Sequence, residues 1–499
     1  MSLPSRTSRR LITGSIMLAT IMDSLDSTIA NVALPHIRGS ISATQEQVAW
    51  VLTSFLLAMA VTTPLTGWLA GRIGRKRVFL WSIAGFTTVS VACGLASSLF
   101  EIVLFRTLQG VCGAALIPLS QAVLLDINRP EDHGRAMAIW SGGVMVAPIF
   151  GPIVGGWLTD HASWRWIFYI NLPIGILAFL GVLAFTTEYR VKGLRTFDFF
   201  GFCSLGLGIG ALQLILDRGE IQDWFASPEI CIEATVAGLC LYLFIVHTVT
   251  TSEQSFFNRA LLRDRNFLTG TLVGGVIGLL FNATLALIPS LLHDLLGYPA
   301  VATGVAMAPR GIGSLLSIIV VGRLVGHLDS RLILAVGLSL MCLAQVSMSG
   351  FSLQMDVWPI IWSSLIQGMG VGFSFVPLST LAFATLDPGL RTEGAAIFTL
   401  MRTLGGSTGI AITQALLTRN TQAVHAMLVE HLRFDNPLAR PPFLADSFSL
   451  STSIGLARLD VEVTRQATMV AYVENFRTML LLGVVLIATL PLLRRRKKG

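Results

Sequence analysis

One stretch of this chain occurs twice and decides its fold. Residues 107–120 read Thr-Leu-Gln-Gly-Val-Cys-Gly-Ala-Ala-Leu-Ile-Pro-Leu-Ser, and residues 365–379 read Leu-Ile-Gln-Gly-Met-Gly-Val-Gly-Phe-Ser-Phe-Val-Pro-Leu-Ser, with one residue inserted. Other positions match at offsets of 255 to 259 residues: Gly67 with Gly322, Leu69 with Leu324, Gly71 with Gly326, Ala138 with Ala396 and Gly151 with Gly409. The second half of the chain therefore repeats the first.

The sequence around these copies is apolar from end to end. Hydrophobic residues make up 53% of the chain and charged residues 13%, whereas a soluble domain has about 25% charged residues. Runs of about 20 apolar residues, long enough to cross a bilayer as a helix, recur throughout. We predict an all-α polytopic membrane protein with fourteen transmembrane helices, near residues 12–34, 47–70, 78–98, 102–125, 135–158, 164–186, 197–217, 229–250, 267–292, 301–325, 332–351, 357–385, 394–417 and 477–493.

The long offset between the copies predicts how these spans are grouped. Two parallel six-span halves with two extra spans between them (6 + 2 + 6) explain the spacing, which is the two-half plan of the major facilitator fold, with a substrate cavity near the midplane. We assign residues 1–190 to the N-terminal bundle, 191–262 to the inserted pair and 263–499 to the C-terminal bundle, including an extracytoplasmic loop at 418–475.

Positive charge indicates the orientation and excludes some functions. Lys and Arg gather in alternate loops and in the tail at 494–498, so both termini are predicted to be cytoplasmic. The net charge of +7 follows from this topology and requires no nucleic acid.

The first run is too long and too acidic for a cleaved signal peptide. The chain carries no phosphate-binding loop, and its six cysteines show no paired metal-ligand spacing. We expect a non-enzyme without metal or cofactor.

The most informative charges lie inside the first and fourth spans. Asp23 and Asp26 each cost roughly 2.5 to 3.5 kcal/mol at a helix centre, and their spacing places them on nearly one helix face. Two such carboxylates raise each other's affinity for a proton and can titrate as a unit, which proton coupling requires. The alternative is a carboxylate permanently paired with Arg106, a buried cation whose expected partner is a span 1 aspartate or a backbone carbonyl.

Further polar residues within the spans are candidates for the substrate cavity. They are Asn31, Gln109, Asn282, Arg310, Gln367 and Arg402. For Asn282, as for Glu233 in the eighth span, a packing or boundary role is the alternative.

Several longer motifs carry a family resemblance. They are Asp26-Ser-Thr-Ile-Ala-Asn-Val-Ala-Leu-Pro35, Gly67-Trp-Leu-Ala-Gly-Arg-Ile-Gly-Arg-Lys-Arg77, Arg106-Thr-Leu-Gln-Gly110, Ala147-Pro-Ile-Phe-Gly-Pro-Ile-Val-Gly-Gly156, Trp164-Arg-Trp-Ile-Phe-Tyr-Ile-Asn-Leu-Pro-Ile-Gly175, Leu216-Asp-Arg-Gly, Asp223-Trp-Phe and Arg402-Thr-Leu-Gly-Gly-Ser. Together they resemble the fourteen-span drug:proton antiporters of the major facilitator superfamily, and most of all the EmrB type. The resemblance favours Asp26 as the proton carrier and implicates Arg106 in modulating it.

The resemblance also implies positions that control packing and conformational change. They are Gly67, Gly71, Arg72, Gly74, Arg75, Gly110, Gly151, Pro152, Gly155 and Gly156. Gly143, Ala147, Gly151 and Gly155 form a ridge of small residues that lets helices approach closely, and Pro148 and Pro152 are expected to kink the span. Gly71 departs from the family pattern, which has an acid there, so we expect Arg75 and its neighbours to pair with acids such as Asp126 or Glu131.

The segment 418–475 is too long for an ordinary connection. Asp435-Asn-Pro and Arg440-Pro-Pro divide it, and Leu456, Leu459, Val463, Ala467 and Val470 have the spacing of an amphipathic helix. By the resemblance, this projection would contact a membrane-fusion adaptor that passes substrate to an outer-membrane channel. A solvated loop without a partner is the alternative.

These observations lead to one functional hypothesis and two alternatives. The leading hypothesis is a multidrug efflux transporter of the bacterial inner membrane, which uses the proton gradient and alternating access to export hydrophobic or amphiphilic toxic compounds. An exporter of one endogenous metabolite, lipid, fatty acid or siderophore is the second hypothesis. A channel or membrane receptor, independent of a proton gradient, is the third.

Overall fold

The computed structural model describes residues 6–188, 197–251, 258–325, 327–432 and 452–492. Within these ranges the chain is almost entirely helical and forms no strand. The predicted all-α class is confirmed.

The N-terminal half forms six rods, three of which are broken into two helices. The break between α2 and α3 follows Pro64 and bends the rod by 57°, because proline cannot continue the hydrogen-bond ladder of a helix. The rods are α1 (Arg6–Ser40), α2 (Gln45–Thr62) with α3 (Leu65–Ile73), α4 (Arg75–Leu95), α5 (Leu99–Gly113) with α6 (Leu116–Ile127), α7 (His133–His161), and α8 (Trp166–Tyr169) with α9 (Asn171–Phe185).

Side-chain caps fix where several rods begin. Thr44 and Gln47 form a reciprocal capping box at the start of α2, and the Ser98 hydroxyl accepts a hydrogen bond from the Glu101 amide at the start of α5. Such caps satisfy backbone N–H groups that have no partner within the helix. The polar residues between the apolar runs therefore set the helix boundaries.

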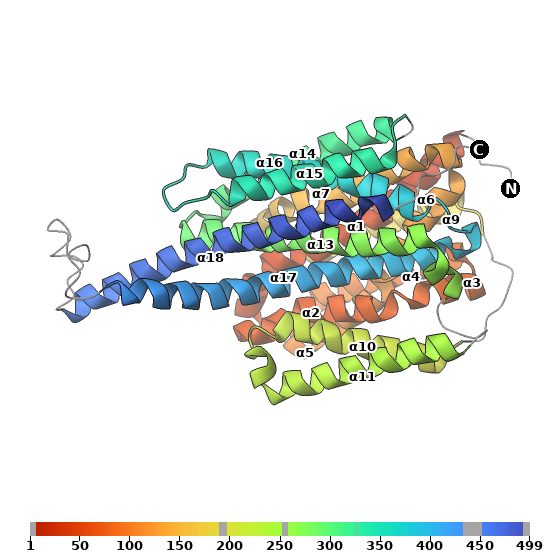
Figure 1. Ribbon diagram of the computed structural model, residues 1–499. Helices are drawn as coiled ribbons and strands as arrows, with labels where there is room; N and C mark the ends of the chain where they lie inside the picture. Colours follow the sequence, from red (N-terminus) through yellow and green to blue (C-terminus); the bar gives the residue numbers. More distant parts are fainter. Residues whose placement is uncertain (1–5, 189–196, 252–257, 326, 433–451, 493–499) are drawn as a thin grey trace.

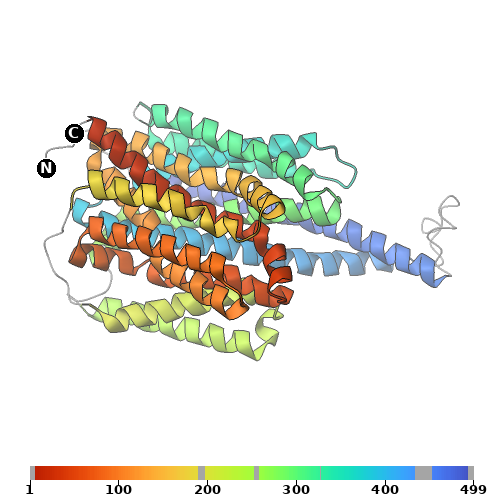
Figure 2. The ribbon, with the colours of Figure 1, turned by 180° about the vertical axis from the view of Figure 1, so that it is seen from behind.

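The inserted pair lies at one edge of the bundle in both views (Figure 1 and Figure 2). It consists of α10 (Phe199–Arg218) and α11 (Pro228–Thr250), joined through η2 (Trp224–Ala226). α10 packs against α2 and α17, whereas α11 packs mainly against α10. The short α12 (Arg259–Arg263) leads into the second half.

The C-terminal half again forms six rods. They are α13 (Arg265–Ser290) with η3 (Leu291–Leu295), α14 (Ala300–Leu324), α15 (Ser330–Met348), α16 (Trp358–Ala382), α17 (Arg391–Glu430) preceded by η4 (Pro388–Leu390), and α18 (Ser453–Thr489) followed by η7 (Leu490–Leu492). Eleven of the described helices are long and apolar enough to cross a membrane, or twelve with the bent α2–α3 pair. α1 and α7, 35 and 29 residues long, are additional rods at predicted positions. The count of fourteen spans and the domain boundaries stay predictions.

The segment 418–475 differs from the predicted loop. α17 continues as a helix to Glu430 and α18 begins at Ser453, so the described parts of this segment extend two spans as a helical hairpin beyond the other rods (Figure 1). The predicted helix from Leu456 to Val470 is confirmed as part of α18, but its apolar face is buried only in part: Val463 and Ala467 are buried, whereas Leu456 and Val470 are exposed. Asp435 and Arg440 lie outside the described residues.

The bundle has two distinct ends. α1 begins and α18 ends toward one of them (Figure 1), which we call the terminal end, and the α17–α18 hairpin projects from the other, which we call the hairpin end. The two halves contact each other through α7 with α14 and through α6 with α17. These contacts leave a cavity between the halves, described below.

Candidate functional site

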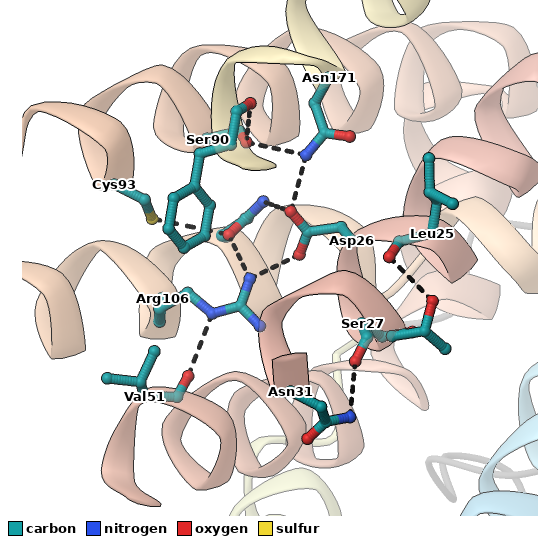
Figure 3. Close-up of polar contacts among 12 residues, drawn as sticks. Leu25, Asp26, Ser27, Asn31, Val51, Ser90, Cys93, Arg106 and Asn171 are labelled. Carbon is teal, nitrogen blue, oxygen red and sulfur yellow. Dashed lines mark hydrogen bonds and ion pairs between the residues drawn. The ribbon is translucent and has the colours of Figure 1, made fainter. Parts of the chain in front are cut away.

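Asp26 is held in a buried polar cluster inside the N-terminal half (Figure 3). Asp26 is 2% exposed and Arg106 is 0% exposed. Nη1 of Arg106 lies 2.5 Å from Oδ2 of Asp26, while Nε2 of Gln109 and Nδ2 of Asn171 donate to Oδ1 at 3.0 and 2.7 Å. Both carboxylate oxygens of Asp26 therefore accept charged or amide donors, which repays part of the cost of burying the charge.

Arg106 is itself fixed from several helices. Its Nε donates to the carbonyl oxygen of Val51 on α2 at 3.1 Å, its Nη1 donates to Gln109 Oε1 at 2.8 Å, and its guanidinium lies 4.2 Å from the centre of the Phe55 ring. Arg106 and Gln109 reach the same carboxylate because they are three residues apart on α5. The predicted partner of Arg106 is a span 1 aspartate or a backbone carbonyl, and the structure shows one of each, Asp26 and the Val51 carbonyl.

Asp23 has different surroundings from Asp26, although it is also only 2% exposed. It accepts no hydrogen bond among the described residues, and its Oδ1 is shielded from solvent. Oδ1 lies against Gly113 of α5, where an added Cβ would be 3.0 Å away. Asp23 faces the space between the two halves, where Arg402 is among the charged groups that interact with it electrostatically.

The cavity between the halves that is lined by Asp23 and Arg402 measures about 280 Å³, close to the lower limit of pockets that hold small molecules. Asp23 and Arg402 are the two charged residues in its wall, one from each half. Arg402 also lies 5.5 Å from the ring centre of Phe375 and 5.9 Å from that of Trp140. The rest of the wall is mainly apolar, formed by Phe55, Leu56, Met59, Ile117, Val144, Met145, Phe281, Leu285, Phe375 and Ile410.

The predicted cavity residues have different positions. Asn282 and Arg402 line the cavity, and the other four are not in its wall. Asn31 is exposed and donates to the Ser27 carbonyl, Gln109 belongs to the Asp26 cluster, and Arg310 is buried and donates to the Phe281 carbonyl at 2.9 Å. Gln367 is 0% exposed, and its amide has no hydrogen-bond partner among the described residues. Glu233, the boundary candidate, lies 4.0 Å from Arg218.

Charged residues join the two halves at the terminal end. Asp126 at the end of α6 forms ion pairs with Arg75 of its own half and with Arg391 of the other half, the latter at 2.7 Å. Arg75 also donates to the Pro388 carbonyl at 3.3 Å. The predicted pairing of Arg75 with Asp126 is confirmed, and Arg391 adds a partner from the opposite half that sequence analysis missed.

The motif residues around Arg75 have separate packing roles. An added Cβ at Gly67 would lie 3.0 Å from Glu393 of α17, so this glycine permits close contact between α3 and α17. Gly74 has a φ of +105°, which favours glycine. Gly71 has open space around it, and the Arg72 guanidinium lies 5.3 Å from the Trp68 ring centre.

The small-residue ridge of α7 faces α1. Added Cβ atoms would lie 3.0 Å from the Thr28 Cβ at Gly151 and 3.1 Å from the Ile29 Cγ2 at Gly155, whereas Gly156 has open space. Gly110 similarly allows α5 to approach the backbone of α2. Pro148 and Pro152 lie in α7, but their side chains are not among those that the structure describes. The kink expected at these prolines stays a prediction. The predicted close approach along the ridge is confirmed.

Two members of the Asp26 cluster, Asn171 and Ser90, were not predicted from the sequence. Asn171 donates to Ser90 Oγ at 3.0 Å as well as to Asp26, and the Ser90 hydroxyl donates to the Phe168 carbonyl at 2.9 Å. Asn171 lies within the quoted motif that begins at Trp164, so its signal was present in the resemblance. Ser90 carries no such signal, because a serine in an apolar helix is common.

Comparisons with known proteins give a consistent result. The model of the Major Facilitator Superfamily matches residues 16–410. The multidrug export protein EmrB of Escherichia coli is 36% identical over 491 residues, which cover 96% of this chain and 95% of that protein. The fatty acid resistance protein FarB of Neisseria gonorrhoeae is 35% identical over 478 residues, or 95% and 94% of the two chains. The solved proton:xylose symporter XylE has a TM-score of 0.64 at 13% identity, covering 99% and 97%, a likeness of fold alone.

Proposed function

The chain belongs to the major facilitator superfamily and to its EmrB-type multidrug export permeases, and we propose that it exports hydrophobic and amphiphilic compounds in exchange for protons. The observation that carries the proposal is the cavity between the halves, whose apolar wall holds one acid and one base. Apolar walls with a few polar groups suit greasy ligands of varied shape.

The contacts between the halves support alternating access. In this state the Asp126–Arg391 ion pair and the close contact of Gly67 with Glu393 join the halves at the terminal end. The cavity lies farther toward the hairpin end, between Asp23 and Ile410. We propose that transport alternately breaks these terminal-end contacts and closes the cavity toward the hairpin end.

Asp23 is our candidate for the exchangeable proton. Asp26 already has Arg106, Gln109 and Asn171 as donors, so a proton on Asp26 would displace established hydrogen bonds. Within the described part of the chain Asp23 has no such donor, and it faces the cavity. An unpaired carboxylate in a low-dielectric site takes up a proton in preference to staying charged. In this assignment Asp26 and Arg106 position the helices around Asp23.

We propose that the terminal end is cytoplasmic and that the membrane is the bacterial inner membrane. Arg72, Arg75 and Arg77 lie at the terminal end together with the basic start of α1, and cytoplasmic ends collect positive charge. The hairpin would then project on the opposite side of the membrane.

We also propose that the hairpin binds a membrane-fusion adaptor, which would connect the transporter to an outer-membrane channel. Large apolar side chains are exposed along its described length: Met427, Val429, Ile454, Leu456 and Val461. Exposed apolar side chains that gather on a projecting element are typical of a protein–protein contact. The projection thus offers a surface that lies clear of the bundle.

One observation favours a narrower alternative, the export of an endogenous fatty acid or a related acidic lipid. Arg402 lines the cavity and has no ion pair or hydrogen bond among the described residues. FarB, one of the relatives, is named for fatty acid resistance. A panel of unrelated toxic compounds in a pump-deficient host separates the two: protection against several structural classes supports multidrug export, and protection against fatty acids alone supports the alternative.

Proton coupling is tested with the full-length protein in proteoliposomes. An imposed pH gradient is expected to drive ethidium transport by the natural protein, Asp23→Asn is expected to weaken this transport strongly, and Asp23→Glu to retain most of it. Proteoliposomes that accumulate ethidium equally with and without the gradient would overturn the antiport proposal. Full gradient-driven transport by Asp23→Asn would overturn the assignment of Asp23.

A further inference from the structure

A half-buried carboxylate with one shielded oxygen lies on the inserted helix α10, away from Asp23 and Asp26. Asp217 lies one residue before the end of this helix. Its Oδ2 is shielded and accepts no hydrogen bond from the described residues. An acid with one oxygen that is shielded from water and accepts no hydrogen bond is costly to keep charged.

No cation neutralises Asp217 among the described residues. The adjacent Arg218 turns away from it, forming an ion pair with Glu229 of α11 and lying 4.0 Å from Glu233. Arg218 also lies 5.3 Å from the ring centre of Trp50 on α2. Arg218 is therefore occupied by the two acids of the neighbouring helix α11, and Asp217 has polar but uncharged partners.

Those partners connect Asp217 to the transport cavity. Nε2 of Gln213, one turn earlier on α10, donates to Asp217 Oδ1 at 3.0 Å and to the Ser407 hydroxyl oxygen at 2.9 Å. Ser407 belongs to α17 of the C-terminal half and lines the cavity. Thr53 of α2 is a further polar neighbour of Asp217. A continuous polar path thus runs from the inserted pair to the cavity wall.

Two acceptor atoms along this path lack a donor among the described residues, as expected at a site that binds a proton. Oδ2 of Asp217 and Oε1 of Gln213 are both buried acceptors without a donor among the described residues, and they belong to two side chains that are already hydrogen-bonded to each other. A proton on Oδ2 converts that atom into a donor. One proton on Oδ2 thereby neutralises the acid and turns an unsatisfied acceptor into a donor.

We propose that Asp217 is a second proton-binding carboxyl group of the transporter, linked to the cavity through Gln213 and Ser407. This inference rests on the proposed proton antiport and extends it, because it gives the inserted pair a part in energy coupling. In each cycle Asp217 takes up a proton when the cavity is open toward the hairpin end and releases it when the cavity opens toward the other end. Gln213 is a positioning residue, since it acts through Asp217 and Ser407.

The test measures how many protons are exchanged per substrate. Full-length protein in proteoliposomes is given a fixed pH gradient, with the membrane potential clamped at zero, and the opposing ethidium gradient that just stops net transport is found. Each coupled proton contributes a factor of ten to that gradient per pH unit, because one pH unit corresponds to tenfold in proton activity. Loss of one coupled proton in Asp217→Asn should therefore lower the balancing gradient tenfold at a one-unit pH difference.

Three further variants make the result specific. Asp217→Glu keeps a titratable group and is expected to restore the natural ratio. Gln213→Leu keeps the acid but cuts its link to Ser407, and is expected to lower the ratio as Asp217→Asn does. Glu229→Gln removes an acid at the same end of the insert that already has a cation partner, and is expected to keep the natural ratio.

The outcomes separate this inference from the antiport proposal. If the natural protein builds no ethidium gradient in response to the pH gradient, the antiport proposal fails. If the natural protein does so, and Asp217→Asn and Gln213→Leu both balance at the natural gradient, then Asp217 only anchors α10 to α17 and the inference is wrong. Thermal unfolding in detergent identifies any variant that does not fold. If Asp217→Asn does not fold, the balancing gradient of Gln213→Leu, which retains the acid, decides whether the inference holds.

Discussion

At the scale of single residues, two acids one helical turn apart on α1 have opposite surroundings. Asp26 is neutralised by Arg106 and by two amide donors, whereas Asp23 faces the cavity without a hydrogen-bond partner among the described residues. In our proposal, Asp26 therefore has a structural role and Asp23 is available for proton exchange. Neighbouring helices, rather than the acids themselves, impose this division.

The Asp26–Arg106 pair should show strong energetic coupling. Removing one member leaves the other as a buried, unpaired charge, which typically costs 3–5 kcal/mol, whereas removing both leaves no unpaired charge. We expect Asp26→Asn and Arg106→Met each to lower the unfolding temperature in detergent more than the double variant does. Unfolding shifts that simply add in the double variant would contradict a tight pair.

Arg402 should influence which compounds are transported. Its guanidinium is the cation of the cavity wall, and a charge-assisted hydrogen bond to a substrate carboxylate contributes about 1.5 to 3 kcal/mol. We expect Arg402→Gln to reduce protection against acidic amphiphiles about tenfold or more while leaving protection against cationic dyes nearly unchanged. The inhibitory concentrations for a matched pair of acidic and cationic compounds provide the measurement. An equal loss for both would indicate a packing role for Arg402.

The sequence predicted the partner of Arg106 only in part at this scale. A span 1 aspartate was expected, but Asp23 and Asp26 share nearly one helix face, and the choice depends on Asn171 and Ser90 from distant parts of the chain. At Gln367 the repeat predicts the residue but not its surroundings. It repeats Gln109 in the second half, yet Ser364 occupies the position equivalent to Arg106, so the Gln367 amide lacks the charged neighbour that holds Gln109.

At the scale of helices, glycine spacing decides how closely neighbours approach. Gly151 and Gly155 bring α7 against Thr28 and Ile29 of α1, next to the turn that carries Asp26. Van der Waals packing through such small residues is a main source of helix association in a bilayer, where apolar surfaces gain little from leaving lipid. The position of α1 relative to α7 therefore depends on these two residues.

Valine substitutions along α7 should separate the packed face from the open one. Gly151→Val and Gly155→Val place methyl groups where the backbone and side chains of α1 already lie, so we expect loss of transport and a lower unfolding temperature. Gly156→Val is the matched control, because nothing lies within 4 Å of its added Cβ. Equal behaviour of all three variants in ethidium efflux would contradict the proposed contact.

The sequence predicted elements well wherever the membrane imposes a pattern. Apolar runs located each rod, and the spacing of glycines along α7 located its contact with α1. The extensions of α17 and α18 were missed, because residues 418–430 and 453–475 lie beyond the apolar runs and carry mixed polarity. Leu456, Val463 and Ala467 indicated a helix there, but not that it continues the following span without a break.

At the scale of the whole molecule, Asp126 links the two halves. It pairs with Arg75 within the first half and with Arg391 at the start of α17 in the second. The family places an acid at the position of Gly71, and here that carboxylate is absent. The Asp126–Arg391 pair provides a direct charge contact between the halves at the same end of the molecule.

Removing this contact should shift the population of the two states. We expect Asp126→Asn to favour opening at the terminal end, and spin labels at positions 131 and 327, on opposite halves, to report a longer distance by pulsed electron resonance. Asp132→Asn is the control, because Asp132 lies 3.8 Å from Arg9 within the same half. An unchanged distance distribution in Asp126→Asn would show that the pair does not hold the halves together.

The continuity of α17 has a mechanical consequence. One uninterrupted helix of 40 residues runs from Arg391 in the ion pair, past Arg402 in the cavity wall, to Glu430 in the hairpin. At 1.5 Å per residue the helix is about 60 Å long, and about 42 Å of it extends beyond Arg402. It therefore behaves as a lever arm: a tilt of about 10° around the cavity displaces its outer tip by about 7 Å. A protein bound at that tip would be displaced by this distance in each transport cycle.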